Sequence, residues 1–243
     1  MSVSVSKEPA RIAGMFDAIA RRYDTLNHLL SAGFDKRWRR RAVRALALTG
    51  RERLLDMCTG TADLAIAAAT VPTGQAAEII GIDFSGEMLR HAAAKVRAAG
   101  LGRRIHIVRG DATTMPMADA SVDAAAVAFG IRNVIDAAQA CGEFRRVLRP
   151  GGRLAVLEFG APRMPGLRTA YLWYFRRVLP RIGALVSAHP DAYAYLPASV
   201  LDFPTGDAFV SMLRRAGFGE VRYERLSFGV VYLYIATNSS PPK

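Results

Sequence analysis

The fold of this chain is decided by RLLDMCTGTADL, residues 53–64. Its apolar run ends at Asp56, a tight turn centres on Gly60, and Thr61 and Asp63 lead into a segment of helical character. A second apolar run, EIIGID, ends at Asp83. This order predicts the first half of a nucleotide-binding α/β domain, in which an acid after the second strand binds a ribose.

The glycine content of the turn indicates which cofactor fits. A dinucleotide fold uses G-x-G-x-x-G so that the backbone can approach a pyrophosphate, whereas CTGTAD at 58–63 supplies one glycine. A cofactor with a ribose and an adenine but no phosphate fits better, and S-adenosylmethionine is the common one. For this segment alone, a strand, turn and helix without any ligand is the competing interpretation.

Apolar runs and helical patterns alternate from residue 53 onward. Strands are predicted near 53–57, 79–83, 105–109, 122–128 and 153–158. Helices are predicted near 63–70, 86–99 and 136–148. This alternation indicates a parallel sheet with right-handed crossovers, and two closing apolar runs around Gly229 predict a hairpin.

The chain is long enough, at 243 residues, to form one large α/β domain. Its expected parts are an N-terminal helical cap at 1–50, a cofactor-binding core at 51–160, an inserted helical substrate region at 161–204, a C-terminal helix and closing hairpin at 205–237, and a disordered tail at 238–243. An apolar stripe at helical spacing runs through the cap from Phe16 to Leu30.

A net charge of +12 favours anionic partners such as nucleic acid, anionic lipid or acidic substrates. The competing account is genome composition, because most of the 33 basic residues are arginines in an alanine-rich chain. We find no span pattern, no signal peptide, and two isolated cysteines. A cytoplasmic protein is therefore expected, with peripheral association at the inner face of the membrane considered below.

Three acids are predicted at the carboxyl ends of consecutive strands, where ligands of open α/β sheets bind. They are Asp56, Asp83 and Asp111. Asp83 could accept both ribose hydroxyls, and Asp111 could accept an adenine amine. Each acid alone could be a helix cap or a turn residue, but three together indicate a site.

The fourth strand ends in AFGIRN, residues 128–133. Phe129 could stack on adenine or substrate, with Arg132 and Asn133 on the loop over the site. The four histidines are scattered, so no metal site is predicted. Neither G-x-S-x-G nor a phosphate-binding loop is present, which removes support for hydrolase and NTPase functions.

Several segments together resemble the ubiquinone/menaquinone biosynthesis C-methyltransferases, the UbiE/MenG type, over residues 12–236. They are MFDAIARRYDTLNHLLSAGFDKRWRR, LLDMCTGTADLA, GDATTMPMADASVDAAAVAFGIRNV, EFRRVLRPGGRLAVLEF and AYAYLPASVLDFP. The FGIRN loop and the FD-x-IA-x-x-YD-x-x-N opening are the specific parts. The resemblance implies a class I methyltransferase fold, with a seven-stranded, mostly parallel sheet and an antiparallel last strand.

The resemblance also implies the cofactor contacts. S-adenosylmethionine is expected at Thr61, Asp83, Asp111 and Ala112. Asp56 and Gly60 would shape the pocket floor. Thr59 and Ala62 stand where family members often have glycine, which tightens the turn slightly.

The implied reaction is methylation of a ring carbon of a polyprenylated quinol, demethylmenaquinol for choice, with a benzoquinol as the alternative. The family pattern places Tyr23, Asn27, Arg132 and Asn133 around the ring. Arg132 would stabilise the developing phenolate, and a water or His28 would take the proton.

The prenyl tail makes membrane-surface association an expected partner interaction, and a homodimer is also expected. Ordinary lid packing over the site is the competing account of the apolar stripe. Other functions to be separated by experiment are an RNA methyltransferase, although no nucleic-acid partner is expected, and a non-enzymatic S-adenosylmethionine-binding scaffold.

Overall fold

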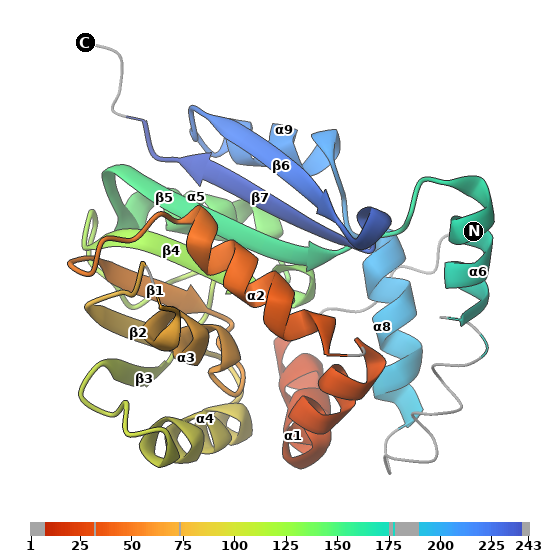
Figure 1. The fold of residues 1–243 in the computed structure, drawn as a ribbon, viewed down its shortest axis with the longest axis horizontal. Helices are drawn as coiled ribbons and strands as arrows, with labels where there is room; N and C mark the ends of the chain where they lie inside the picture. Colours follow the sequence, from red (N-terminus) through yellow and green to blue (C-terminus); the bar gives the residue numbers. More distant parts are fainter. Residues whose placement is uncertain (1–7, 32, 73, 175–176, 178–189, 240–243) are drawn as a thin grey trace.

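A computed structural model describes residues 8–31, 33–72, 74–174, 177 and 190–239. Its strands are β1 (Arg53–Met57), β2 (Glu78–Asp83), β3 (Ile105–Arg109), β4 (Val122–Ala128), β5 (Leu148–Phe159), β6 (Val221–Leu226) and β7 (Val231–Thr237). In this part of the chain they form one seven-stranded sheet in the order β3-β2-β1-β4-β5-β7-β6 (Figure 1). Strands β1 to β5 pair in parallel, and β7 runs antiparallel to both β5 and β6, which confirms the expected fold class.

The described helices cover both faces of the sheet and its carboxyl edge. They are α1 (Pro9–Leu30), α2 (Phe34–Ala45), α3 (Asp63–Thr70), α4 (Gly86–Ala98), α5 (Ala137–Val147), α6 (Pro165–Trp173), α8 (Pro190–Asp202) and α9 (Asp207–Arg215), with short 3-10 turns η1 (Ile131–Asn133) and η3 (Ser227–Gly229). The chain therefore alternates strand and helix through the core, as the apolar runs predict.

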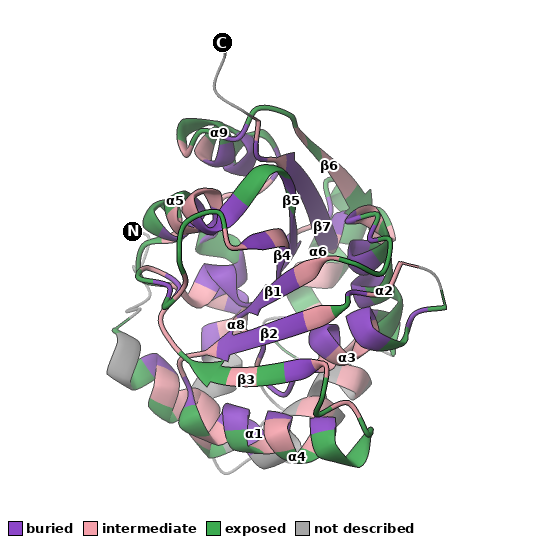
Figure 2. Cartoon of the chain, turned by 90° about the vertical axis from the view of Figure 1, so that its left-hand side faces the viewer, coloured by how far each residue is buried: buried purple, intermediate pink, exposed green. Residues whose placement is uncertain are grey.

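Alternating side chains of the strands feed two large cores, because successive residues of a strand point to opposite faces. Leu54 packs with the helices α2, α3 and α4 on one face. Leu55 packs with α5 and α9 on the other face, around Phe144 and Phe209. Figure 2 shows the resulting pattern, with buried central strands between helices that are exposed on their outer sides.

Two boundaries differ from the expectation. Strand β5 begins at Leu148 rather than near 153, and its pairing with β4 changes register after Val122. The disordered tail expected from residue 238 is wrong for Asn238, which is buried and donates hydrogen bonds to the carbonyls of Arg145 and Leu148. Residues 240–243 lie outside the described residues.

Candidate active site

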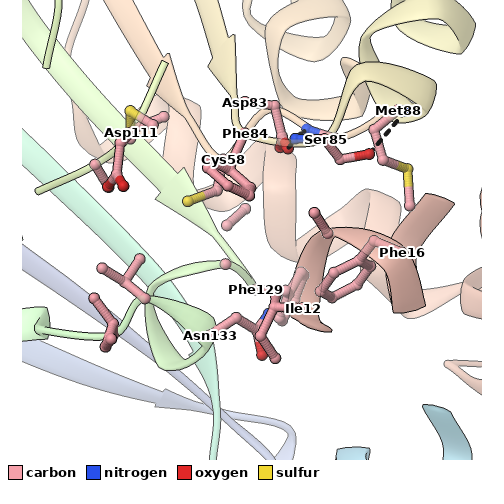
Figure 3. A pocket seen from close by; sticks show the side chains of 18 residues that line it. Ile12, Phe16, Cys58, Asp83, Phe84, Ser85, Met88, Asp111, Phe129 and Asn133 are labelled. Carbon is pink, nitrogen blue, oxygen red and sulfur yellow. Dashed lines mark hydrogen bonds between the residues drawn. The ribbon is translucent and has the colours of Figure 1, made fainter. Parts of the chain in front are cut away.

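A cavity lies at the carboxyl ends of β1, β2 and β4, with about 770 Å³ of empty space including its open mouth. Strand β2 supplies Asp83, and the loop after β3 supplies Asp111 and Ala112. The loop after β4 supplies Phe129 and Asn133, and α1 supplies an apolar wall of Ile12, Ala13 and Phe16 (Figure 3). The site thus combines two carboxylates, one amide and mostly apolar surfaces.

Asp83 ends β2 and lines this cavity beside Phe84 and Ser85 (Figure 3). Its Oδ2 accepts a hydrogen bond from the Gly60 amide at 2.8 Å, and its Oδ1 accepts one from the Ser85 amide at 2.9 Å. Burial raises the pKa of Asp83, although these amides act in the opposite direction. A desolvated carboxylate of this kind is further stabilised by hydroxyl donors from a ligand.

The turn between β1 and α3 is bent by left-handed backbone conformations. Cys58, Gly60 and Ala62 have φ values of 56°, 57° and 68°. Such values are easily adopted by glycine and rarely by other residues. Ala62, at the start of α3, therefore takes a conformation that a glycine would take without strain.

Asp56 lies beneath the turn and does not line the cavity. Its Oδ2 accepts hydrogen bonds from the Thr59 hydroxyl at 2.6 Å and from the Ala65 amide at 3.1 Å. Complete burial raises the pKa of Asp56 to about 7. Asp56 therefore stabilises the turn and the first turn of α3.

Thr61 also points away from the cavity. Its hydroxyl donates to the Asp24 carboxylate of α1 at 2.5 Å, and Asp24 also pairs with Lys95 of α4 at 2.6 Å. Asp17 also lies on α1, and its Oδ1 accepts a hydrogen bond from the Ser85 hydroxyl at 2.5 Å. These bonds hold α1 against the core at the rim of the cavity.

Asp111 follows β3 and lines the cavity beside Ala112. Its Oδ1 accepts hydrogen bonds from the amide and the hydroxyl of Thr113, both at 2.8 Å. No described residue donates a hydrogen bond to the second carboxylate oxygen, Oδ2, which therefore remains available to a ligand amine.

Phe129 forms an aromatic wall of the cavity. Its ring stacks on Phe159 with centroids 4.4 Å apart, and the Arg39 guanidinium carbon lies 5.5 Å from its centroid. Its φ of 60° is a strained value for a phenylalanine and turns the chain sharply after β4. Phe129 lines the cavity, and its stacking on a bound ligand stays a prediction.

Arg132 is buried and lies behind this wall rather than in the cavity. Its Nη1 donates to Glu158 Oε1 at 2.8 Å and to the Phe129 carbonyl, and its backbone amide donates to Glu158 Oε2 at 3.2 Å. Glu158 is fully buried and was not expected at the site. A single acid near the end of the apolar run RLAVLEF was the available signal.

The remaining expected residues belong to α1. Tyr23 and Asn27 lie on this helix, but their side chains are outside the described part of the structure. His28 does not line the cavity, and its Nδ1 lies 2.8 Å from Asp35 Oδ2. Phe16, the first residue of the apolar stripe, lines the cavity together with Ile12, which supports lid packing for this part of the stripe.

Comparison with known proteins identifies the family. The profile of the ubiE/COQ5 methyltransferase family matches residues 3–238. The chain belongs to this family. The ubiquinone/menaquinone biosynthesis C-methyltransferase UbiE of Geobacter sp. strain M21 is 43% identical over 234 residues, which cover 96% of this chain and 99% of the relative. The demethylmenaquinone methyltransferase of Thermus thermophilus is 47% identical over 221 residues, 91% and 98% of the two chains.

Solved structures show the same fold at lower identity. A methyltransferase from Thermotoga maritima, described as S-adenosylmethionine-dependent, is similar with a TM-score of 0.64 and 21% identity, covering 94% of this chain and all of that chain. The cofactor of the present chain, as a member of the ubiE/COQ5 methyltransferase family, is S-adenosylmethionine. The cavity fits it, since its acids suit hydroxyl and amine donors and its turn lacks a phosphate-binding glycine pattern.

Proposed function

We propose that this methyltransferase methylates a ring carbon of a polyprenylated quinol, converting demethylmenaquinol to menaquinol. The observation that carries the proposal is a largely apolar cavity in which the Asn133 amide lies beside aromatic and aliphatic walls. Relatives named for demethylmenaquinone methylation from Thermus thermophilus and Mycolicibacterium vanbaalenii, at 47% and 40% identity, support the naphthoquinol. Relatives named UbiE support the quinone class as a whole.

The cofactor is assigned to the sheet side of the cavity. Asp83 would accept the ribose hydroxyls, Asp111 the adenine amine, and Gly60 and Ala112 would let the ligand approach the backbone. Bound there, S-adenosylmethionine supplies an electrophilic methyl group. Asp56 and Thr61 would act indirectly, by holding the turn and α1 in place.

The quinol ring is assigned to the side of the cavity formed by Phe129, Asn133 and α1. A reduced ring that loses a phenolic proton carries negative charge on its oxygen and on the ortho carbon, which becomes the nucleophile. The enzyme contributes mainly orientation, worth up to about 7–11 kcal/mol in favourable cases, and a poorly hydrated site that strengthens its electrostatics.

Arg132 takes a different role from the one first expected. Because Glu158 balances its charge at 2.8 Å, we assign Arg132 to holding the Phe129 carbonyl and the η1 turn. Stabilisation of the phenolate passes to the Asn133 amide. A water in the open cavity takes the proton, since His28 is engaged by Asp35 away from the cavity.

Quinone profiling by mass spectrometry tests this proposal in cells that lack the protein. We expect a naphthoquinone one methyl group lighter than the normal product to accumulate. Accumulation of an unmethylated benzoquinone would move the substrate to the ubiquinone branch. An unchanged quinone profile together with lost RNA methylation would contradict the proposal.

A further inference from the structure

Asn133 lies at the end of η1, where its side chain lines the cavity beside Phe129 and Ile12 (Figure 3). Its backbone is fixed, because its amide donates to the Gly130 carbonyl at 3.0 Å and the preceding amide is held by Glu158. The remaining freedom is rotation of its carboxamide. Which end of that group faces a ligand decides whether the residue donates or accepts a hydrogen bond.

Tyr195 restricts this rotation from another part of the chain. It belongs to α8, in the segment AYAYLPAS, and its hydroxyl lies 3.1 Å from Asn133 Oδ1. An amide oxygen can only accept, so the phenol must donate this bond. Tyr195 is buried, and burial raises its pKa, so that the phenol keeps its proton at neutral pH.

With Oδ1 held by the phenol, the Nδ2 group of Asn133 has no hydrogen-bond partner among the described residues. An NH₂ group carries two donors and matches an acceptor on the ligand. The oxygen of a deprotonated quinol is such an acceptor. A donor aimed at developing negative charge is among the strongest contributions to catalysis.

We propose that Tyr195 is a positioning residue that orients the Asn133 carboxamide, so that Nδ2 donates to the ring oxygen of the quinol. This inference rests on the proposed function and names how its substrate oxygen is bound. Tyr195 itself does not line the cavity, so it acts through Asn133. It also links the inserted region around α8 to the chemistry of the core.

Steady-state kinetics with S-adenosylmethionine and a short-chain demethylmenaquinol test the proposal. Tyr195→Phe should lower kcat about fivefold to tenfold, the effect of one lost hydrogen bond. Asn133→Ala should lower it about 100-fold, as for one lost oxyanion donor. Because Tyr195 acts through Asn133, adding Tyr195→Phe to Asn133→Ala should change kcat no further. Cofactor affinity and melting temperature should match those of the wild type throughout.

A matched control and a second substitution keep the test independent of folding. Tyr223→Phe removes a hydroxyl on β6, remote from the cavity, and should leave kcat unchanged. Asn133→Asp keeps an acceptor for the Tyr195 phenol but offers no donor, so its kcat should fall as far as that of Asn133→Ala.

Two results would overturn the role of Tyr195. One is a wild-type kcat in Tyr195→Phe. The other is a Tyr195→Phe substitution that lowers kcat as much in the Asn133→Ala background as in the wild type. Wild-type kcat in Asn133→Asp would overturn the donor assignment. If the unmodified enzyme methylated no quinol at all, the proposed function itself would fail, and this inference with it. If the wild type methylated the quinol and Tyr195→Phe left kcat unchanged, this inference alone would fail.

Discussion

Asp83 combines hydrogen bonds that hold the backbone with a place in the lining of the cavity. It holds Gly60 and Ser85 while lining the cavity. If it also binds the ribose, Asp83→Ala removes charge-assisted hydrogen bonds worth about 1.5–3 kcal/mol each. Calorimetry should show S-adenosylmethionine affinity reduced at least about tenfold. Unchanged affinity in a folded variant would remove Asp83 from the site.

Asp56 should make the stability of the protein depend on pH. Its pKa is raised by burial from 3.8 to about 7, so folding disfavours its ionised form. Stability from this group is highest when it is protonated and falls as the pH rises from about 4 to about 7. Asp56→Asn resembles the protonated acid. The free energy of unfolding of this variant relative to that of the wild type should therefore be higher at pH 8 than at pH 5.

Urea unfolding at the two pH values measures this difference. The control is Asp119→Asn, which changes an exposed carboxylate paired with Arg146 on the surface. An Asp56→Asn variant whose stability relative to the wild type is the same at both pH values would show that the carboxylate is ionised throughout.

The Arg132–Glu158 ion pair should contribute mainly to the stability of the fold. Arg132→Leu leaves the buried Glu158 carboxylate without its cation, a change that costs about 3–5 kcal/mol in comparable buried pairs. Replacing both residues by leucine should recover much of that loss. Urea unfolding of the single and double variants tests this, and a single variant as stable as the wild type would show that the ion pair does not stabilise the fold.

At the scale of single residues, sequence located the acids at the strand ends but not what they do. Asp83 and Asp111 line the cavity, whereas Asp56 lies beneath the turn. Strand ends are visible in an apolar pattern, but the partner of Arg132 is not, since Glu158 lies on a different strand. Tyr195 was equally hidden, because its contact depends on how the inserted region folds back.

The elements of the core are well encoded locally. Strands β1, β3 and β4 and helix α3 have the predicted bounds, because apolar runs there end at clear turn residues. The placement of α1 was less accessible, since an amphipathic stripe does not say which surface it covers. The structure shows Ile12 and Phe16 on the cavity and acidic residues on the core.

Helix α1 should control how long the cofactor stays bound. Asp24 joins it to Thr61 and Lys95, and its first turns form a wall of the cavity. Asp24→Asn weakens this attachment and should raise the dissociation rate of S-adenosylmethionine about threefold to tenfold, for a loss of about 1 kcal/mol. Stopped-flow measurement checks this, with Asp119→Asn as the control, and an unchanged rate would show that α1 is not a gate.

At the scale of the whole molecule, a surface beside the site joins apolar and basic side chains. Leu167 and Trp173 of α6 are exposed, and so are Arg168 on the same helix and Arg163 and Met164 just before it. None of the described helices is long and apolar enough to cross a membrane. The proposed prenylated substrate makes this surface a candidate for contact with anionic lipid, while the expected homodimer stays a prediction.

Vesicle sedimentation tests the membrane contact. Binding should rise with the fraction of anionic lipid and fall with salt, because exposed charges are screened over about 8–10 Å at physiological ionic strength. Trp173→Ala should weaken binding, and Val108→Ala on the far strand β3 should not. Salt-independent or absent binding would favour genome composition as the origin of the +12 charge.

Carbon methylation of a quinol in the cavity formed by β1, β2, β4 and α1 can be measured on the purified protein. Its most direct test incubates the purified protein with methyl-labelled S-adenosylmethionine and short-chain demethylmenaquinol, kept reduced, and locates the label by mass spectrometry and NMR. We expect one labelled methyl on a ring carbon of the naphthoquinol and none on added RNA. Label on RNA, on a quinol oxygen or on no acceptor at all would contradict it.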